Sequence, residues 1–209
     1  MTNLNLWKRQ LGAVPGEVWA RTDLETLVLA DNGLTSLSAE VGKLKRLRML
    51  DLGHNALPAV PESLGELEGL DFLYLHDNQL DALPSLSKLS KLRYLNLSEN
   101  RFTSLPSTVL ELSGLVELRL DDNQLVSFPP LGLRGLRELH MRNNQLTTLE
   151  VGELIGLRHL DLRGNPLVTL PESLLGLPAL DKLDLRWTPS LVAPPWLERL
   201  EARGVLVYR

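Results

Sequence analysis

The stretch LDFLYLHDNQL, residues 70–80, sets two kinds of side chain on opposite faces of an extended chain. Alternate residues of a strand point to opposite sides, so Leu73 and Leu75 share one face. The other face carries three rings, those of Phe72, Tyr74 and His76. The leucines predict a buried face, and the rings then lie on the face that is not the core.

Six further segments repeat this pattern, so that seven copies read LxxLxLxxNxL. They are LETLVLADNGL (24–34), LRMLDLGHNAL (47–57), LRYLNLSENRF (92–102), LVELRLDDNQL (115–125), LRELHMRNNQL (136–146) and LRHLDLRGNPL (157–167). Subtraction gives spacings of 23, 23, 22, 23, 21 and 21 residues between the repeat asparagines, Asn32, Asn55, Asn78, Asn100, Asn123, Asn144 and Asn165. Two degraded copies flank them at residues 4–11 and 180–190, with Arg9 and Thr188 at the asparagine position. Seven copies in one register exclude coincidence.

The pattern resembles the leucine-rich repeat family over essentially the whole chain. Pairs such as Leu83-Pro84 and Leu105-Pro106 make it similar to the 23-residue class of bacterial and intracellular signalling proteins. The resemblance implies an α/β fold: a right-handed solenoid, or horseshoe, with a parallel concave sheet and loops or short helices on the convex side. We expect one domain, residues 1–209, with an N-terminal degraded repeat and cap at 1–23, core repeats at 24–179, and a last repeat and C-terminal cap at 180–209.

Other features predict how such a solenoid is held together and closed. The resemblance implies that the repeat asparagines form a hydrogen-bonded ladder. Tryptophans gather near both ends and are predicted to cover core leucines there, with ligand contact as the alternative for Trp7 and Trp187. The segment from Trp196 onward predicts a short helix and then a strand. The spacings of 21 between Asn123 and Asn165 predict little helix on the outer arc.

The composition argues against several classes of partner. The chain has 22 Lys and Arg against 26 Asp and Glu, a net charge of −4, so we expect no nucleic-acid partner. It has no cysteine, which excludes disulfides and thiolate sites and suits a reducing compartment. No run of about 18 apolar residues occurs, so we expect no membrane partner. We expect a cytoplasmic monomer, with an exported effector as the alternative.

The third, fifth, seventh and eighth positions of each repeat are expected to project from the concave sheet. Like positions in neighbouring repeats then stand about 5 Å apart. Three of the rings in these columns cluster in two adjacent repeats, and rings with a polar handle on a rigid scaffold are typical of protein-binding hot spots. The candidate partner-binding residues are Met49, Phe72, Tyr74, His76, Tyr94, Arg119, His140, Arg142, His159, Arg163 and Arg186.

Each part of this surface has a plainer interpretation. Aromatic residues favour strands and pair across them for about 0.2–1 kcal/mol, which predicts a scatter along the sheet rather than a cluster. An arginine column with Asp161 and Asp184 one position inward predicts surface ion pairs of little value. The same column fits recognition of an acidic or phosphorylated segment, which arginine binds by paired hydrogen bonds.

No pattern in the chain predicts catalysis. His140 and His159 lie diagonally with backbones about 8 Å apart, and His140 with Asp161 supplies only two ligands, so we expect no metal and no other cofactor. The seventh column runs in the order His76, Ser98, Asp121. A catalytic triad needs histidine between the other two residues, so this order does not fit. A hydrolase that uses concave histidine and aspartate is a remote alternative.

We therefore predict a non-catalytic module that binds a protein or peptide on its concave face. The apolar anchor is predicted to consist of Phe72, Tyr74, His76 and Tyr94, with the arginines as orienting charges. The family resemblance implies a signalling adaptor or an effector. The alternative is a passive scaffold or targeting module that acts through its convex face or its termini.

Overall fold

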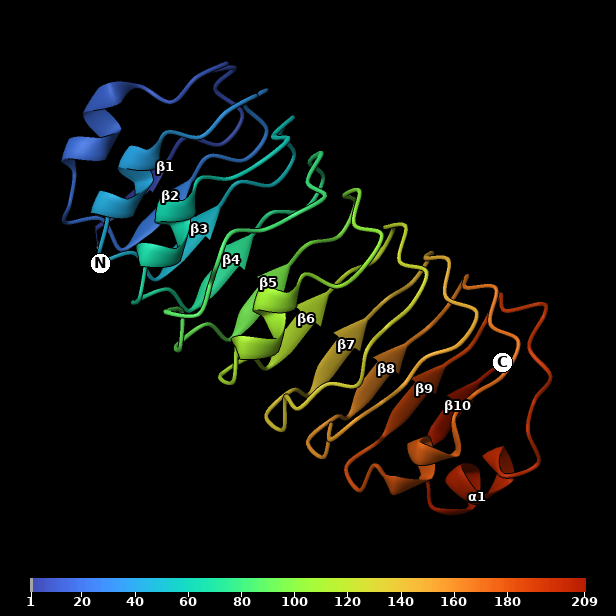
Figure 1. Ribbon diagram of the computed structural model, residues 1–209. Coiled ribbons are helices and arrows are strands. Elements are labelled where there is room, and N and C mark those ends of the chain that lie inside the picture. The colour runs from blue at the N-terminus through green and yellow to red at the C-terminus, as the bar shows by residue number, and fades with distance from the viewer. Residues whose placement is uncertain (1) are drawn as a thin grey trace.

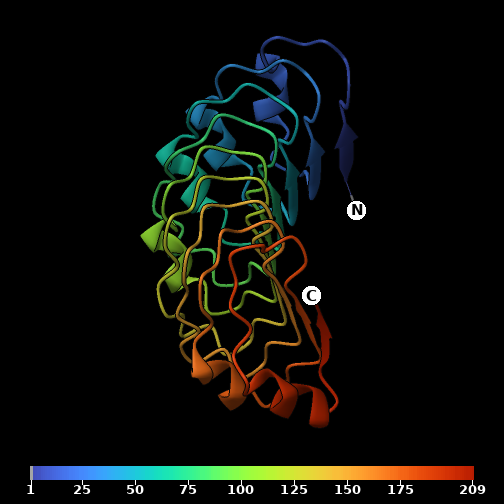
Figure 2. The same cartoon turned by 90° about the vertical axis from the view of Figure 1, so that its right-hand side faces the viewer.

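The computed structural model describes residues 2–209 and consists of one parallel sheet whose strands follow the order of the chain (Figure 1). Each strand has three residues. The strands are β1 (Asn3–Asn5), β2 (Thr26–Val28), β3 (Met49–Asp51), β4 (Phe72–Tyr74), β5 (Tyr94–Asn96), β6 (Glu117–Arg119), β7 (Glu138–His140), β8 (His159–Asp161), β9 (Lys182–Asp184) and β10 (Leu206–Tyr208). The strands line the concave side of a shallow arc, with short helices on the opposite side (Figure 2).

The strands pair so that equivalent repeat positions stand side by side. Phe72 is the neighbour of Tyr94, and Tyr74 is the neighbour of Asn96. The same register runs from β2 to β9, where His159 stands beside Lys182. The predicted columns of third and fifth positions therefore exist along the whole sheet.

Stacked leucines form the core between the sheet and the outer arc. Leu50, Leu73 and Leu95, the central residues of β3 to β5, have no exposed surface. A fully buried leucine contributes about 1.5–3 kcal/mol relative to an exposed one, and a single repeat has no second layer to supply that burial. The repeats consequently stabilise one another in sequence.

The repeat asparagines form the predicted ladder. The side-chain amide of Asn55 donates to the carbonyls of Leu52 at 2.9 Å and of Leu29, one repeat earlier, at 3.2 Å. Its Oδ1 accepts from the backbone N–H of Asn32 at 3.1 Å and of Leu34 at 3.0 Å. Each repeat asparagine thus satisfies backbone groups of two repeats as the chain leaves the strand.

The outer arc contains only short helices. Five are 3-10 helices of five residues: η1 (Gly16–Ala20), η2 (Ala39–Lys43), η3 (Glu62–Glu66), η4 (Ser107–Glu111) and η5 (Glu172–Gly176). In the described part of the chain no such helix lies between Asn123 and Asn165, which confirms the prediction from the 21-residue spacings, and none lies in the 22-residue repeat after Asn78. No helix within residues 2–209 is long and apolar enough to cross a membrane.

Both ends of the stack carry an extra strand. At the C-terminal end, α1 (Leu197–Ala202) is followed by β10, which pairs with β9, as predicted. Trp19 is 5% exposed and Trp196 packs against the core, so these two rings do cover it. The prediction is wrong for Trp7 and Trp187, which are 56% and 67% exposed because their position in the repeat projects away from the leucines.

The eighth position of every repeat has a left-handed backbone. Examples are Asp77 with φ 49°, Asn143 with φ 54° and Gly164 with φ 67°. This conformation costs most L-residues roughly 1–2 kcal/mol and is best tolerated by glycine, asparagine and aspartate. The fold therefore constrains which residues this column can hold.

Candidate functional site

Rings from the three adjacent repeats of β3, β4 and β5 lie close together. They form a continuous aromatic cluster, defined here as Phe72, Tyr74, His76, Tyr94 and His54. The ring centroids of Tyr74 and Tyr94 are 4.8 Å apart, and those of Phe72 and Tyr94 are 6.4 Å apart. Tyr74 and His76 lie 6.3 Å apart, edge to face. The structure thus brings together the predicted anchor residues and adds His54, whose role the sequence did not suggest.

The cluster is open on its outer side. Phe72 is 41% exposed, while Tyr74, Tyr94 and Met49 are half-buried. Burial raises the pKa of both tyrosine hydroxyls, so each remains protonated at neutral pH and can donate a hydrogen bond. A surface of this kind offers apolar area together with polar handles.

A chain of polar contacts fixes the histidine end of the cluster. His54 Nδ1 lies 2.7 Å from Asp77 Oδ2, and His54 Nε2 lies 3.2 Å from His76 Nε2. Burial, followed by the neighbouring His54, lowers the pKa of His76. The ring of His76 lies over Gly53, where an added Cβ would come within 2.3 Å of it, so the glycine makes room for the ring.

Two hollows border the cluster. One, of about 710 Å³, lies beside Phe72 and Met49 and also contains Lys45 and Arg48. The other, of about 520 Å³, is lined by His54 among its residues. Phe72 and His54 each line one of two hollows that can receive side chains from another molecule.

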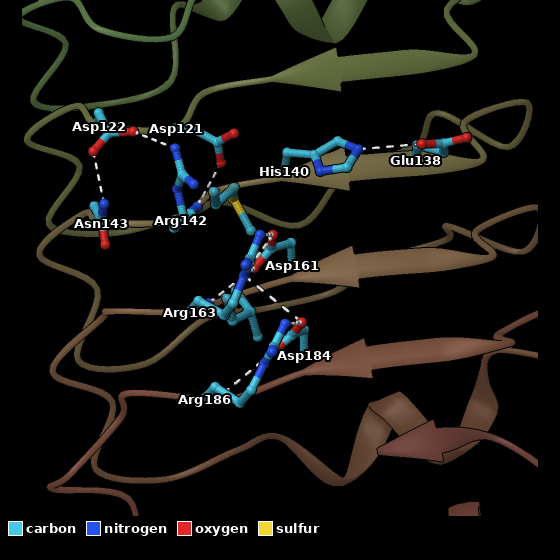
Figure 3. A network of polar contacts seen from close by, with 12 residues as sticks. Asp121, Asp122, Glu138, His140, Arg142, Asn143, Asp161, Arg163, Asp184 and Arg186 are labelled. Carbon is cyan, nitrogen blue, oxygen red and sulfur yellow. Dashed lines mark hydrogen bonds and ion pairs between the residues drawn. The ribbon is translucent and has the colours of Figure 1, made fainter. Parts of the chain in front are cut away.

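The concave face beyond β6 is charged and largely paired within itself (Figure 3). Asp161 and Asp184 are each 1% exposed, and each receives two parallel hydrogen bonds from an arginine two residues later. Arg186 binds Asp184 at 2.9 and 2.7 Å, and Arg163 binds Asp161 at 2.9 and 2.5 Å. We call these four residues the arginine–aspartate lattice.

Hydrogen bonds from the arginines decide the charge state of the lattice aspartates. Burial alone would raise the pKa of Asp184, but the hydrogen bonds and charge of Arg186 outweigh it, and the pKa lies below its usual value. Asp161 behaves in the same way with Arg163. The two aspartates are therefore ionised although almost no water reaches them, whereas Arg163 and Arg186 keep 23% and 40% of their side chains exposed. The pairs are half-buried, unlike the surface ion pairs expected from the sequence.

The other predicted arginines also have partners in the chain. Arg142 Nη2 donates to Asp122 at 2.9 Å, and the Nε of Arg119 donates to Glu117 at 2.6 Å. Both side chains keep more than a third of their surface exposed. Each guanidinium therefore keeps N–H groups that can donate to another molecule, although a carboxylate of the chain already balances its charge.

The fifth-column carboxylates also hold the backbone. Asp51, Asp161 and Asp184 accept hydrogen bonds from the backbone N–H two residues later, at 2.9, 3.1 and 3.3 Å. The amides Asn5 and Asn96 do the same. The fold therefore favours Asp or Asn at the fifth position, because either residue closes the turn after the strand.

One histidine cluster differs from what the sequence suggested. His140 is the register neighbour of Asp161, but the carboxylate of Asp161 is bound by Arg163, and His140 Nε2 lies 3.2 Å from Oε2 of Glu138 instead. Ligand atoms of Glu138, His140 and His159 all lie within 4.8 Å of one another. No metal was expected from the sequence because the backbones of the two histidines are far apart. That expectation left out Glu138, which the register places beside His159.

Nothing in the described geometry assembles a hydrolytic triad from the seventh column. Ser98 Oγ is buried and has no hydrogen-bond partner within residues 2–209. Asp121 accepts instead from the backbone N–H of Arg142 at 2.8 Å. No hydrogen bond therefore links Ser98 to His76.

Solved structures of similar architecture include the LRR ectodomain of the plant membrane receptor kinase GASSHO1/SCHENGEN3 from Arabidopsis thaliana, in complex with CASPARIAN STRIP INTEGRITY FACTOR 2. It is 25% identical, with a TM-score of 0.67 over 100% of this chain and 32% of that one. The crystal structure of PEPR1–AtPEP1 is 35% identical, with a TM-score of 0.62 over 72% of this chain and 23% of that one. The chain therefore spans about a quarter to a third of the length of these proteins.

Family models give the same result from the sequence. No curated protein sequence matches the chain significantly. The model described as leucine rich repeat matches residues 22–80 and 134–189, which is more than half of the chain, and a two-copy leucine rich repeat model matches residues 68–111. The chain belongs to the leucine-rich repeat family.

Proposed function

We propose that this protein is a recognition module that binds a protein or peptide on its concave face. The observation that carries the proposal is the aromatic cluster, in which five rings from adjacent repeats form one surface with Phe72 41% exposed. Leaving such area in water is unfavourable, and its burial by a partner would recover that free energy. The anchor residues are Phe72, Tyr74, His76 and Tyr94, with Met49 beside them.

The size of the sheet suits this role. Ten strands about 4.8 Å apart give a face roughly 43 Å long, enough for an interface of about 800 Å² per partner. The similar GASSHO1/SCHENGEN3 ectodomain was solved in complex with CASPARIAN STRIP INTEGRITY FACTOR 2, which supports a protein ligand for this architecture. Fold similarity alone does not select the ligand, so the aromatic cluster remains the main argument.

The charged columns supply orientation rather than attraction. Arg119, Arg142, Arg163 and Arg186 already have carboxylate partners, so the field outside this region is nearly balanced. Their free donors fit an acidic or phosphorylated segment of the partner, and the half-buried His159 flanks the same path. His140 was also predicted to contact the partner, but it is only 7% exposed and is too buried for that role. We expect such contacts to fix the register of the partner more than its affinity.

The role in the cell belongs to the same proposal. A cytoplasmic signalling adaptor or an exported effector would each use one binding face, and a monomer would leave that face free. A scaffold that acts through its outer surface makes the opposite prediction about which substitutions matter.

The test is affinity capture from the native extract, read out by mass spectrometry. The bait is the wild-type chain beside the Tyr74→Ala/Tyr94→Ala variant. We expect at least one protein to be captured by the wild type and lost with the variant, while far-UV circular dichroism shows an intact fold. Removal of two half-buried rings lowers stability by roughly 1–3 kcal/mol, which a stack of this size tolerates.

A control variant replaces two exposed apolar residues outside the cluster. Val126 and Val168 are 54% and 53% exposed, and the Val126→Ala/Val168→Ala variant should capture the same protein as the wild type. Capture that is lost with this control and kept by the tyrosine variant would favour the scaffold and contradict the proposal.

A further inference from the structure

Three metal-ligand side chains meet on the concave face at a point separate from the aromatic cluster. Glu138 and His140 lie two residues apart on β7, so both project from the same face of the strand. His159 lies on β8, in register with Glu138. One ligand atom from each residue lies within 4.8 Å of the other two.

The spacing of the first two donors already matches a coordination shell. His140 Nε2 and Glu138 Oε2 are 3.2 Å apart. Ligands at 2.0–2.2 Å from a tetrahedral zinc ion stand about 3.3–3.5 Å from one another. The third donor comes from a ring 4.9 Å from that of His140, centroid to centroid, and must move by less than about 2 Å, within the reach of side-chain rotation.

The two imidazoles are prepared for this role in different ways. His140 is 7% exposed, which holds its ring in place. His159 Nε2 is buried and has no hydrogen-bond partner within residues 2–209, although buried polar atoms are normally paired.

The surrounding charges leave the site available. Asp161 is the register neighbour of His140, but its carboxylate is bound by Arg163. Lys182 disfavours a cation, yet its ammonium lies 5.3 Å from the ring centroid of Tyr208, on the far side of β9 from His159. Glu138 keeps 45% of its side chain exposed and supplies the negative charge at the mouth of the cluster.

We propose that Glu138, His140 and His159 bind one divalent transition-metal ion of the zinc type, with the fourth coordination position open toward the concave surface. Two imidazoles and one carboxylate form a ligand set that suits zinc and its first-row neighbours. The open position would accept water or a donor side chain from a molecule on the concave face. The site does not depend on the aromatic cluster and stands or falls separately from the proposed function.

The test uses the tag-free chain, freed of metal with a chelator, and Zn²⁺ alone as the probe. Equilibrium dialysis with elemental analysis should give one zinc ion per chain, and Co²⁺ should develop the visible absorption of a tetrahedral site. The His159→Gln variant should weaken zinc binding by more than tenfold, because loss of a ligand exceeds the roughly 10-fold to 100-fold effect of losing an outer hydrogen bond.

A second pair of histidines provides the matched control. The His54→Gln/His76→Gln variant removes two imidazoles that also lie 3.2 Å apart but leaves the proposed ligands intact, and it should bind zinc like the wild type. Circular dichroism confirms that each variant is folded. Zinc binding that is absent in the wild type, unchanged in His159→Gln, or lost in the control variant would overturn the proposal.

Discussion

The strands β3 to β5 and β7 to β9 have the same backbone and register but fill their concave positions in opposite ways. In the first region the fifth position of β4 is Tyr74, a half-buried ring in an open cluster. In the second region it is Asp161 or Asp184, each 1% exposed and bound by its own arginine. In β7 to β9 the charged groups are hydrogen-bonded within the molecule, whereas in β3 to β5 apolar surface is left exposed.

This difference separates stability from recognition. A buried ion pair stabilises little relative to a well-packed apolar pair, but loss of one partner is costly. An exposed ring contributes little to folding and gains most of its burial from another molecule. We therefore expect substitutions in β7 to β9 to affect folding first, and those in β3 to β5 to affect binding first.

The largest effect is expected for Asp184→Ala. This change removes the acceptor of two hydrogen bonds from the Arg186 side chain and one from the backbone, and leaves the Arg186 guanidinium without its partner. The free energy of unfolding should fall by about 2–4 kcal/mol, measured by urea denaturation. Asp51→Ala, which loses only the backbone bond to Gly53, should cost about 1 kcal/mol. Equal losses would contradict the special role of the lattice.

Trp187→Gly should not lower the free energy of unfolding. Trp187 has φ 60°, a conformation that costs an L-residue about 1–2 kcal/mol, and its ring is 67% exposed. Its contacts with Arg163 and Arg186, at 5.9 and 5.6 Å, return about 0.5–1 kcal/mol each. We expect the free energy of unfolding to stay constant or rise by up to about 1 kcal/mol in urea denaturation. A loss above that amount would show that the ring caps the stack after all.

Gly53→Ala tests whether a change beside the aromatic cluster affects binding more than stability. The new methyl group would lie 2.3 Å from the ring of His76 and must displace it, while the glycine backbone itself is unstrained. Stability should fall by less than about 1 kcal/mol because the ring can move toward solvent. Capture of the partner should weaken several-fold. Gly132→Ala, where nothing lies within 4 Å of the added carbon, is the control and should change neither quantity.

The smallest effect is expected in the pH dependence of stability. The pKa of His76 is lowered in the fold, first by burial and then by His54, against the opposing charges of Asp51, Asp77 and Glu99. The unfolded chain therefore binds a proton first, near pH 6.5, and stability falls as the pH drops from there toward the folded pKa.

The lattice aspartates should lose their contribution to stability in a different pH window from His76. The lowered pKa values of Asp161 and Asp184 give stability above their unfolded pKa, near pH 4, which is lost only at lower pH. Urea denaturation of the wild type between pH 7 and pH 5, beside His76→Gln, should show a slope that the variant reduces. An unchanged slope would remove His76 from the account.

The sequence predicted the fold better than the chemistry of the surface. Leucine spacing fixes which residues are buried, and the repeat asparagines fix the turns, so the strands and their register followed directly. The fifth-column hydrogen bonds and the left-handed eighth column were missed because they depend on the turn after each strand. The regular presence of Asp, Asn and Gly in those columns was the available signal.

The grouping of Glu138 with His140 and His159 was missed for another reason. Backbone spacing alone placed the two histidines too far apart, but long side chains on diagonal positions reach each other across a sheet. The aromatic cluster was found because Phe72, Tyr74 and Tyr94 occupy adjacent repeats, and register turns adjacent repeats into contacts. The identity of the partner depends on another molecule and has no counterpart in the repeat pattern.

The central claim is that a partner docks on the rings of β4 and β5. Site-specific photo-crosslinking tests it most directly, with benzoyl-phenylalanine placed at Phe72 or, for comparison, at Val126, in native extract. We predict a discrete crosslinked adduct with one protein from position 72 and none from position 126. An adduct formed from position 126 alone, or equally from both positions, would contradict it.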